Sequence, residues 1–521
     1  MTTFTLTTNM DSIAGGSGND TFEGTYNDGA TGTFGVSDIL NGNAGTDTLN
    51  ITPIGVAAIT PADNYWSGIT NIEKIMINTT GAGAQTLTTG TFFEVAFATA
   101  GVALTTTSGA GAVTIDMSTF TGVATLTTTS TDGAQTITTG MGDLATVTAT
   151  STAGAQTITT GTSLATVSAT SGAGAQTIVG ANLVAVTATS TGGAQTITST
   201  GSSVVTVTAT STAGVQTIVT GQGADVITAT TTAAINTITT AAGSDTITLL
   251  AAATGNYTIS AGIGADSVNG GAGNDSVFGG VGNDIIIIGA GSDTVSGGLD
   301  NDSIVGGTDT LSDTIAGGGG NDTIVGGVSS DYVTGGGGND SITTGTGAGA
   351  DTVYGDGGND VITGGTDTLG DSLVGGYGND TISGGAGNDF ITGDAGRDSI
   401  AAGDGNDTVF GGYGSDTISG GAGQDNFVLN IKPGFDVITD FSVTDDTISI
   451  DNSIFTSITT ITADNFVIAT AGAADANDYL IYNNHTGNLF YDADGNGAGA
   501  TIKIAVVGVG LELTSSDFVV V

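Results

Sequence analysis

The chain has 521 residues, and four Lys and Arg against fifty Asp and Glu give it a formal net charge of −46. This charge excludes nucleic acid as a partner, because phosphate would repel so dense a polyanion. The lack of cysteine excludes disulfides and thiolate metal sites, and no apolar run is long enough for membrane insertion. Three prolines and no long amphipathic helical pattern indicate an almost all-β protein.

Residues 1–80 are predicted to form an N-terminal cap or assembly region. Residues 15–22 carry a Gly-Gly-x-Gly-x-Asp signature and residues 43–49 echo it, but neither motif belongs to a run. A metal site here would therefore need a partner turn that the sequence does not show. The segment also holds the only tryptophan, Trp66, and bulky side chains that interrupt a repeat are typical of a solenoid's capped end. An interaction surface is the alternative interpretation.

Residues 81–260 are predicted to form a Thr/Ala-rich solenoid with about 20 residues per coil, because Gln-Thr-(Ile/Leu) recurs every 19 to 21 residues from position 135 onward. Glutamine marks this repeat at Gln85, Gln135, Gln156, Gln176, Gln195 and Gln216, and asparagine at Asn236 and Asn256. A second strand in each coil, such as residues 206–210, alternates Thr with Val or Ala and is predicted to be half buried. Stacked amides can satisfy one another without a metal.

Residues 261–426 contain an aspartate that recurs at fourteen intervals of nine residues and three of eleven. The eighteen positions are Asp266, Asp275, Asp284, Asp293, Asp302, Asp313, Asp322, Asp331, Asp340, Asp351, Asp360, Asp371, Asp380, Asp389, Asp398, Asp407, Asp416 and Asp425. Each lies in a variant of Gly-Gly-x-Gly-x-Asp-x-aliphatic-x, so a large apolar side chain follows two residues later. This phase, kept through eighteen units, argues against a flexible Gly/Asp-rich linker.

Nine residues suffice for a short strand and a tight turn, so two units are predicted to form one coil of a flattened, right-handed parallel helix. Equivalent residues of such a helix stack about 4.8 Å apart. Aspartates stacked at that spacing repel one another, and the turns therefore need a cation between coils. Carboxylate and carbonyl oxygens without His or Cys favour Ca²⁺ over Zn²⁺ or Cu²⁺.

Residues 270–277 and 384–391 resemble the nonapeptide repeats of RTX proteins, the calcium-binding β-roll family. The resemblance implies that the eighteen aspartates, with backbone carbonyls of the glycine turns, bind multiple Ca²⁺ ions between successive turns on one side of the roll. The fold class implied is an all-β protein, in which a right-handed parallel β-solenoid continues into an RTX β-roll between N- and C-terminal β caps.

The two repeat regions share a register. Gln216 to Asp225 and Asn236 to Asp245 each span nine residues, so Gln or Asn upstream is predicted to take the place of the calcium-binding Asp downstream. Asp225 and Asp245 mark the changeover and are candidates for the first members of the metal row. The eleven-residue intervals resemble the longer half-coil, and the calcium geometry there is left open.

Residues 427–521 are predicted to form a C-terminal cap, because residues 436–441 and 446–450 resemble the segment that follows RTX repeats in serralysin-like proteins. Residues 489–491 and 501–504 are predicted to form a hairpin; an EF-hand is rejected because Lys503 occupies the position of the bidentate Glu. Residues 515–521 resemble an uncleaved type I secretion signal, and residues 1–5 lack the features of a Sec signal peptide. We therefore expect the type I secretion machinery to export the chain to the extracellular medium or cell surface.

Catalytic constellations are missing from the sequence. His485 is the only histidine, so a zinc-protease H-E-x-x-H motif is impossible, and no Gly-x-Ser-x-Gly elbow appears. The many carboxylates are periodic, which indicates a structural role. We therefore expect no enzyme.

An RTX protein without a catalytic or pore-forming module most resembles bacterial surface-layer and extracellular fibril proteins. The expected function is a secreted, calcium-dependent structural protein that assembles with copies of itself into a lattice, filament or biofilm matrix. Cell-surface polysaccharide, bound through Ca²⁺, is a further expected partner. The alternative is an adhesin or ice-binding protein that uses outward threonines. These pairs are Thr127/Thr129, Thr148/Thr150, Thr187/Thr189, Thr208/Thr210 and Thr228/Thr230.

Overall fold

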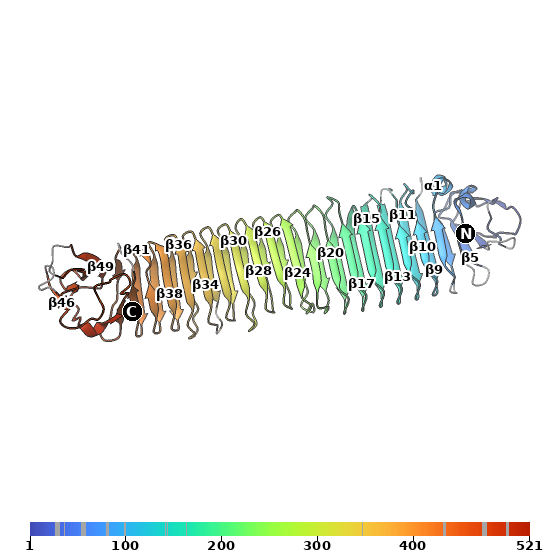
Figure 1. Cartoon of the computed structure of the whole chain (residues 1–521). Coiled ribbons are helices and arrows are strands. Elements are labelled where there is room, and N and C mark those ends of the chain that lie inside the picture. Colours follow the sequence, from blue (N-terminus) through green and yellow to red (C-terminus); the bar gives the residue numbers. More distant parts are fainter. Residues whose placement is uncertain are drawn as a thin grey trace. The chain divides into compact units, whose positions relative to one another are not determined.

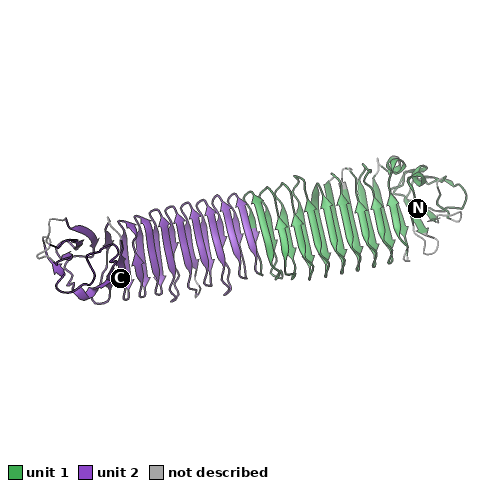
Figure 2. Cartoon of the chain, viewed as in Figure 1, with its two compact units in different colours: residues 1–267, 271–273 green, residues 268–270, 274–521 purple. Residues whose placement is uncertain are grey.

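A computed structural model describes the chain except for residues 27–31, 36, 54–58, 80–82, 98–100, 141, 143, 163, 346, 348, 431–433, 471–476 and 496–499. The chain divides into two compact units (Figures 1 and 2), residues 1–267 with 271–273 and residues 268–270 with 274–521. Each unit is a parallel β-solenoid, as predicted from the repeats. Continuity of the coils from one unit to the next stays a prediction.

One sheet of unit 1, which we call the threonine sheet, is built from parallel strands that each pair with the strand one coil further on. Its strands are β1 (Thr3–Thr5), β3 (Thr21–Tyr26), β5 (Thr48–Pro53), β7 (Lys74–Asn78), β9 (Val102–Ser108), β11 (Ala124–Ser130), β13 (Leu144–Ser151), β15 (Leu164–Ser171), β17 (Leu183–Ser190), β19 (Thr206–Ser211), β21 (Val226–Thr230) and β23 (Thr246–Leu249). Val and Ala point inward and Thr outward, which confirms the half-buried strand predicted from the alternation.

The second sheet of unit 1, the glutamine sheet, is also parallel. Its strands are β8 (Gln85–Thr88), β10 (Val113–Asp116), β12 (Gln135–Thr138), β14 (Gln156–Thr160), β16 (Gln176–Gly180), β18 (Gln195–Ser199), β20 (Gln216–Val219), β22 (Asn236–Thr239) and β24 (Tyr257–Ile263). The register corrects one position of the repeat, because Asn236 pairs with Tyr257 and not with Asn256. The tyrosine hydroxyl takes over the role of the amide, and donates to Oε1 of Gln216 at 2.6 Å.

Residues 1–80 join the solenoid more fully than the sequence indicates. β3 pairs in parallel with β5, so the two Gly-x-Asp motifs near the N-terminus lie in adjacent coils; the prediction that neither has a partner turn is wrong. A third parallel sheet accompanies them, formed by β2 (Ser12–Ala14), β4 (Ile39–Asn41) and β6 (Ile69–Thr70). Beside it lie the 3₁₀ turn η1 (Asp63–Trp66) and the helix α1 (Thr91–Phe97), where Trp66 packs edge-on against Phe93 with ring centroids 5.1 Å apart.

Unit 2 also contains two long parallel sheets. The isoleucine sheet contains β27 (Ile285–Ile287), β29 (Ser303–Val305), β31 (Thr323–Gly327), β33 (Ser341–Gly345), β35 (Val361–Thr363), β37 (Thr381–Ala386), β39 (Ser399–Asp404), β42 (Thr417–Ala422) and β44 (Asp436–Ile438). The tyrosine sheet contains β26 (Ser276–Val281), β28 (Thr294–Leu299), β30 (Thr314–Gly319), β32 (Tyr332–Gly337), β34 (Thr352–Gly357), β36 (Ser372–Tyr377), β38 (Phe390–Gly396), β40 (Thr408–Phe410), β41 (Tyr413–Gly414), β43 (Asn426–Leu429), β45 (Thr447–Ile450) and β50 (Phe518–Val520). The short strand β25 (Ser267–Asn269) spans the boundary of the two units.

The core of unit 2 is a thin double layer of apolar side chains. The isoleucine sheet contributes Ile286, Ile304, Ile324, Ile342, Ile362, Ile382, Ile400, Ile418 and Ile438, all buried. The tyrosine sheet contributes mainly Val, Ile and Leu as far as Phe427, followed by Ile448 of β45 and Phe518 of β50. All eighteen apolar residues that follow the predicted aspartates by two positions are buried, which confirms the proposed phase. Two nonapeptides form one coil, because β34 pairs with β36 and β35 with β37.

The C-terminal region closes unit 2 with larger side chains. β46 (Phe466–Ile468), β47 (Leu480–Asn483), β48 (Asn488–Tyr491) and β49 (Ile502–Val506) form a small mixed sheet, and the 3₁₀ turn η2 (Ser515–Asp517) precedes β50. The antiparallel pairing of β48 with β49 confirms the predicted hairpin, although part of its turn lies outside the described residues. Within the described part of the chain, no helix is long and apolar enough to cross a membrane.

Candidate metal centre

The predicted aspartates of unit 2 stand immediately before the strands, where the backbone leaves a turn and enters a sheet. The N–H of Asp340 donates to Oδ1 of Asp360 at 2.8 Å, and that of Asp360 donates to Oδ1 of Asp380 at 2.9 Å. Repetition of this bond at every coil builds continuous rows. Residues two repeats apart therefore stack, as the sequence predicts.

The rows number two, so the aspartates do not all lie on one side of the roll as the resemblance implied; metal binding by them stays a prediction. Successive nonapeptides feed opposite sheets, and alternate aspartates therefore join different rows. The row at the isoleucine sheet contains Asp284, Asp302, Asp322, Asp340, Asp360, Asp380, Asp398 and Asp416. The row at the tyrosine sheet contains Asp275, Asp293, Asp313, Asp331, Asp351, Asp371, Asp389, Asp407 and Asp425.

Both rows extend past the predicted eighteen aspartates. The N–H of Asp416 donates to Oδ1 of Asp436 at 3.2 Å, and the N–H of Asp425 donates to Oδ1 of Asp446 at 3.1 Å. The nonapeptide signature is already lost around these two residues, which is why sequence reasoning missed them. The intervals of 20 and 21 residues from their row neighbours carry a signal, because they equal the length of one coil.

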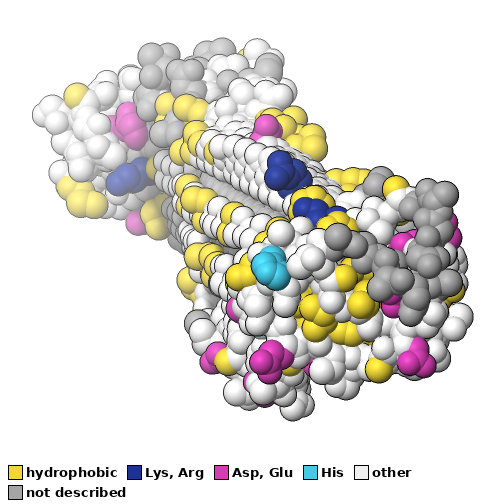
Figure 3. Space-filling model, turned by 90° about the vertical axis from the view of Figure 1, so that its left-hand side faces the viewer, with side chains coloured by type: hydrophobic (Ala, Val, Ile, Leu, Met, Phe, Trp, Pro, Cys, Tyr) yellow, Lys and Arg dark blue, Asp and Glu magenta, His cyan; other side chains and the backbone are white. Residues whose placement is uncertain are grey.

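Most of these carboxylates have a hydrogen-bond donor on only one of their two oxygens. Oδ1 accepts the N–H from the previous coil, whereas Oδ2 of most row members is buried without a hydrogen-bond partner. This holds for Asp293, Asp302, Asp322, Asp331, Asp340, Asp360, Asp380, Asp389, Asp398, Asp407, Asp416 and Asp425. Acidic side chains are visible at the surface in the view of Figure 3, whereas the row aspartates are buried. Buried acceptors without donors are costly unless a ligand satisfies them.

The first glycine of the repeat makes room for this second oxygen. A Cβ on Gly375 would lie 2.5 Å from Oδ2 of Asp380 and 2.8 Å from the carbonyl oxygen of Gly393. A Cβ on Gly355 would lie 2.5 Å from both Oδ2 of Asp360 and the carbonyl oxygen of Gly375. The unpartnered carboxylate oxygen thus approaches a carbonyl oxygen of the next coil, and two acceptors brought together in this way suit a cation.

The electrostatics of the rows point the same way. Burial, reinforced by carboxylates of the same row, raises the pKa of Asp302, Asp360 and Asp398 from 3.8 to about 7. Burial and the neighbouring Asp416 raise the pKa of Asp436 to about 8. A carboxyl with such a pKa is held in an environment that opposes its charged form, so a bound cation would stabilise it.

The donor set fits a hard cation. In the residues that the structure describes, no group of three or more His, Cys, Asp or Glu side chains converges on one point. An ion between two coils would therefore take one or two carboxylates and fill its shell with backbone carbonyls. Ca²⁺ accepts six to eight such oxygens in flexible geometry. The Ca²⁺ predicted from the sequence thus fits the residues present, and when bound it would supply positive charge between the coils.

The eleven-residue intervals change the local geometry. After two of them, the N–H of Gly307 donates to Oδ2 of Asp313 at 3.3 Å, and that of Gly365 donates to Oδ2 of Asp371 at 3.4 Å. These two carboxylates therefore have a weak donor on the oxygen that elsewhere lacks one. The longer turn also brings in Asp309, whose Oδ2 accepts the N–H of Gly291 at 2.7 Å. Part of the third interval, at positions 346 and 348, lies outside the described residues.

Unit 1 contains a short acidic row of its own. The N–H of Asp225 donates to Oδ1 of Asp245, and that of Asp245 to Oδ1 of Asp266, both at 2.7 Å. Asp225 in turn accepts the N–H of Val205 at 2.8 Å. Asp225 and Asp245 therefore share a row with the predicted ligand Asp266, as their register indicates.

The N-terminal motif shows what a carboxylate does when the backbone satisfies it. Asp20 accepts the N–H of Thr2 at Oδ1, 2.6 Å away, and the N–H of Gly16 at Oδ2, 2.7 Å away. These bonds, with that of Gly16 foremost, lower the pKa of Asp20. The motif has the consensus of the roll, but each of its two carboxylate oxygens already accepts a backbone N–H.

Upstream, amides replace carboxylates in the glutamine sheet. Nε2 of Gln176 donates to Oε1 of Gln156 at 2.9 Å, and Nε2 of Gln195 donates to Oε1 of Gln176 at 2.9 Å. Each Nε2 also donates to a backbone carbonyl, as Gln176 does to Thr189 at 3.2 Å. This ladder is neutral and internally satisfied, so it needs no metal.

Comparison with known proteins supports the assignment of the acidic rows. The RTX calcium-binding nonapeptide repeat matches residues 7–25, 37–50, 254–286, 289–310, 308–342, 346–368, 366–400 and 392–427. The matches in unit 2 cover the two rows as far as Asp425, and the first two matches cover the N-terminal motifs of β3 and β5. Comparison with curated proteins gives no match. The chain therefore carries RTX calcium-binding nonapeptide repeats within a parallel β-solenoid.

Proposed function

We propose that this protein is a secreted, calcium-dependent structural protein of the bacterial cell surface that assembles with copies of itself. The observation that carries the proposal is the pair of aspartate rows in unit 2, most of whose members bury an Oδ2 atom that has no hydrogen-bond donor. An excess of uncompensated buried carboxylates makes folding depend on a cation supplied from outside. Calcium is abundant outside cells and scarce inside them, so the rows favour folding after export.

Assembly follows from charge. The net charge of −46 keeps unfolded and calcium-free chains apart. Each Ca²⁺ bound between coils removes two negative charges from this total, so folding and association share one trigger. Strand edges at the ends of a parallel solenoid offer backbone groups to another copy, and such head-to-tail contacts generate filaments or lattices.

The remaining features favour a scaffold over a catalyst. Among the residues that the structure describes, the row carboxylates are spread along the sheets and no three acidic or histidine side chains converge, and His485 lies exposed, with Nδ1 2.8 Å from Oδ1 of the adjacent Asn484. We propose no enzymatic activity. The partners proposed are copies of the chain, the type I secretion machinery and cell-surface polysaccharide bridged by Ca²⁺.

Electron microscopy and light scattering of the full-length protein test this function. We expect ordered polymers at millimolar Ca²⁺, dissociation in excess chelator and recovery when Ca²⁺ is restored. Mg²⁺ at the same concentration is the control for simple charge screening. Equal polymer formation in chelator would reject the proposal, because calcium would then not be the trigger.

The threonine sheet favours a second candidate, an adhesin or ice-binding protein. Two outward rows run through seven consecutive coils in register. One contains Thr105, Thr127, Thr148, Ser168, Thr187, Thr208 and Thr228, and the other Thr107, Thr129, Thr150, Thr170, Thr189, Thr210 and Thr230. Hydroxyl and methyl groups repeated at about 4.8 Å could match an ordered surface, although threonine also suits any exposed strand.

Thermal hysteresis distinguishes this candidate from the first. A freezing-point depression that disappears in Thr148→Lys/Thr208→Lys would support ice binding. If the protein adheres to a solid surface but shows no thermal hysteresis, the outward rows would bind that surface instead of ice. The same variant should then lose adhesion in a binding assay. If the wild type shows no hysteresis and the variant adheres as well as the wild type, the threonine rows have only a structural role.

A further inference from the structure

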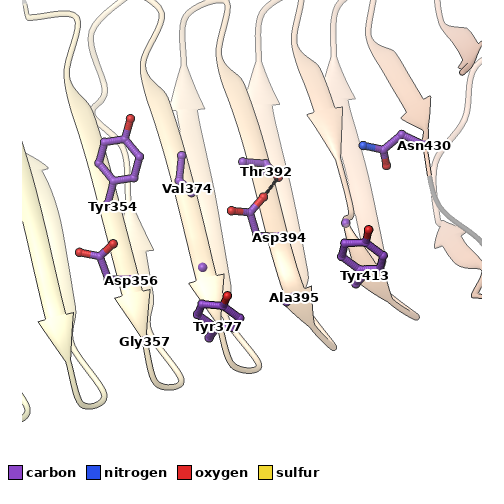
Figure 4. A pocket seen from close by; sticks show the side chains of 12 residues that line it. Tyr354, Asp356, Gly357, Val374, Tyr377, Thr392, Asp394, Ala395, Tyr413 and Asn430 are labelled. Atoms are coloured by element: carbon purple, nitrogen blue, oxygen red, sulfur yellow. Dashed lines mark hydrogen bonds between the residues drawn. The ribbon is translucent and has the colours of Figure 1, made fainter. Parts of the chain in front are cut away.

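The outward face of the tyrosine sheet carries a groove that lies apart from the buried oxygens of the aspartate rows. It encloses about 730 Å³ across β34, β36, β38 and β41 (Figure 4). Its lining combines Tyr354, Tyr377 and Tyr413 with Asp356, Asp394 and Asn430. Aromatic surface with a few fixed polar groups is the composition of a small-molecule or oligomer site.

Two tyrosines at one edge of the groove are spaced by the coil. Tyr377 pairs with Ala395, and Ala395 with Tyr413, so the two rings are two strands apart, or about 9.6 Å. The alanine between them leaves a gap. The tyrosine side chains are 78 and 70 % exposed, respectively, which is unusual for aromatic residues on a rigid sheet. Their separation is about the length of a disaccharide, so each ring could stack on alternate sugars of an extended glycan.

The acidic residues of the groove stand where the repeat otherwise has glycine. Asp356 and Asp394 both pair with Gly376 and take φ values of 68 and 67°, in the left-handed region. A side chain at such a position strains the backbone, and strained non-glycine residues concentrate at functional sites. Asp394 is also oriented, because its Oδ1 accepts the hydroxyl of Thr392 at 2.8 Å.

An unused acceptor completes the polar set. Oδ1 of Asn430 is buried without a hydrogen-bond partner at one end of the groove. With the two carboxylates it gives the groove three side chains with acceptor oxygens, which share the lining with the tyrosines. No described residue of the lining is basic, and the net charge is −46, so an anionic ligand is disfavoured. A ligand rich in hydroxyl donors, with flat apolar faces, matches both the rings and the acceptors.

We propose that this groove binds a neutral oligosaccharide in extended conformation. The sugars stack on Tyr377 and Tyr413 and donate hydroxyl hydrogen bonds to Asp356 and Asp394. This ligand differs from a polysaccharide bridged by Ca²⁺, because recognition uses aromatic faces and direct hydrogen bonds. It also gives the scaffold a means of contact with a cell wall or matrix.

Titration calorimetry of the calcium-loaded full-length chain tests the proposal with cellohexaose as an extended neutral probe and a polygalacturonate hexamer as an anionic one. We expect saturable binding of cellohexaose and none of the anionic hexamer. Tyr377→Ala/Tyr413→Ala should weaken binding at least ten-fold. Phe278→Ala is the matched control, because it removes another exposed ring of the same sheet.

The variants are compared only after their circular dichroism and calcium-induced folding prove equal to those of the wild type. Because Tyr377 and Tyr413 are mostly exposed, we expect them to pass this check. If they do not, Asp394→Asn, which keeps the shape of the side chain, replaces them. Absence of saturable cellohexaose binding, or unchanged affinity in the tyrosine variant, would overturn the proposal. Neither result bears on calcium-dependent assembly.

Discussion

Most row aspartates use their two carboxylate oxygens differently. Oδ1 of Asp398 accepts the backbone N–H of Asp380 in the neighbouring coil, whereas Oδ2 of both residues is buried without a donor, as the proposed cation site requires. Replacing Asp380 and Asp398, which are adjacent in one row, removes both functions from neighbouring coils. We expect Asp380→Ala/Asp398→Ala to raise, several-fold, the Ca²⁺ concentration needed for folding and for polymer formation, while secretion stays intact.

Circular dichroism against Ca²⁺ concentration measures this shift. Asp404→Ala/Asp464→Ala is the control, because it removes the same charge from exposed positions outside the rows. Equal midpoints for the two double variants would show that net charge, and not the row, determines the calcium requirement.

The glycines of the repeat differ in how much space they leave for an added methyl group. A methyl group at Gly375 would meet Oδ2 of Asp380 and a carbonyl oxygen, whereas one at Gly337 would meet nothing within 4 Å. Neither residue has a positive φ, so the comparison isolates packing from backbone strain. We expect Gly375→Ala to destabilise the calcium-bound roll by about 1–3 kcal/mol, as overpacked sites do. Gly337→Ala should be close to neutral in a urea titration of the calcium-bound protein.

At the scale of the rows, protonation of the carboxylates at low pH should stabilise unit 2 in part, as bound calcium is expected to do. The carboxyls of Asp302, Asp360 and Asp398 have an ordinary pKa of 3.8, and burial raises it to about 7 in the folded, metal-free protein. Between these values the folded state binds more protons than the unfolded state, so stability falls as pH rises through this window. Metal-free unit 2 should therefore be more structured at pH 5 than at pH 8.

In excess Ca²⁺ this dependence should reverse, because binding requires deprotonated carboxylates. Circular dichroism of dilute protein at the two pH values, with and without Ca²⁺, gives the four measurements needed. Metal-free protein that gains structure as pH rises would contradict the raised pKa values.

The two ladders predict different responses to a chelator. The amide ladder from Gln135 to Gln216 is neutral and bonded throughout, whereas the carboxylate rows of unit 2 repel once the ion is lost. Limited proteolysis in chelator at pH 8 should therefore digest residues 265–426 and leave a fragment that contains residues 81–220. Complete digestion would mean that unit 1 depends on unit 2 for its stability.

At the scale of the whole molecule, periodicity explains what the sequence could predict. In a coil of two strands, the aliphatic side chain two residues after each aspartate can be buried only between the two sheets. The inward row of isoleucines confirmed this prediction. Stacking at one-coil spacing followed from the intervals alone. A repeat constrains each residue through its neighbours above and below, so a single pattern defines many contacts.

Other features depend on contacts that no period reveals. The division of the aspartates into two rows follows from which sheet each half-coil enters. The partner of Asp20 could not be read from the sequence, because a coil of 27 residues separates it from Asp47. Tyr257, and not Asn256, stacks on Asn236, because the strand is placed one residue later than the Asn spacing predicts. This placement keeps Ile259 paired with Ile238. The groove joins residues from four strands and has no motif.

The uniform isoleucine row has a consequence for how such a chain changes over generations. Coils of unit 2 that are built from two nine-residue repeats meet their neighbours through an inward isoleucine, the same backbone bonds and a row carboxylate. Gain or loss of one such coil by recombination between repeats would therefore alter the length of the roll and leave an equivalent junction behind. Length can then be adjusted in steps of one coil, whereas a globular enzyme rarely survives such an event.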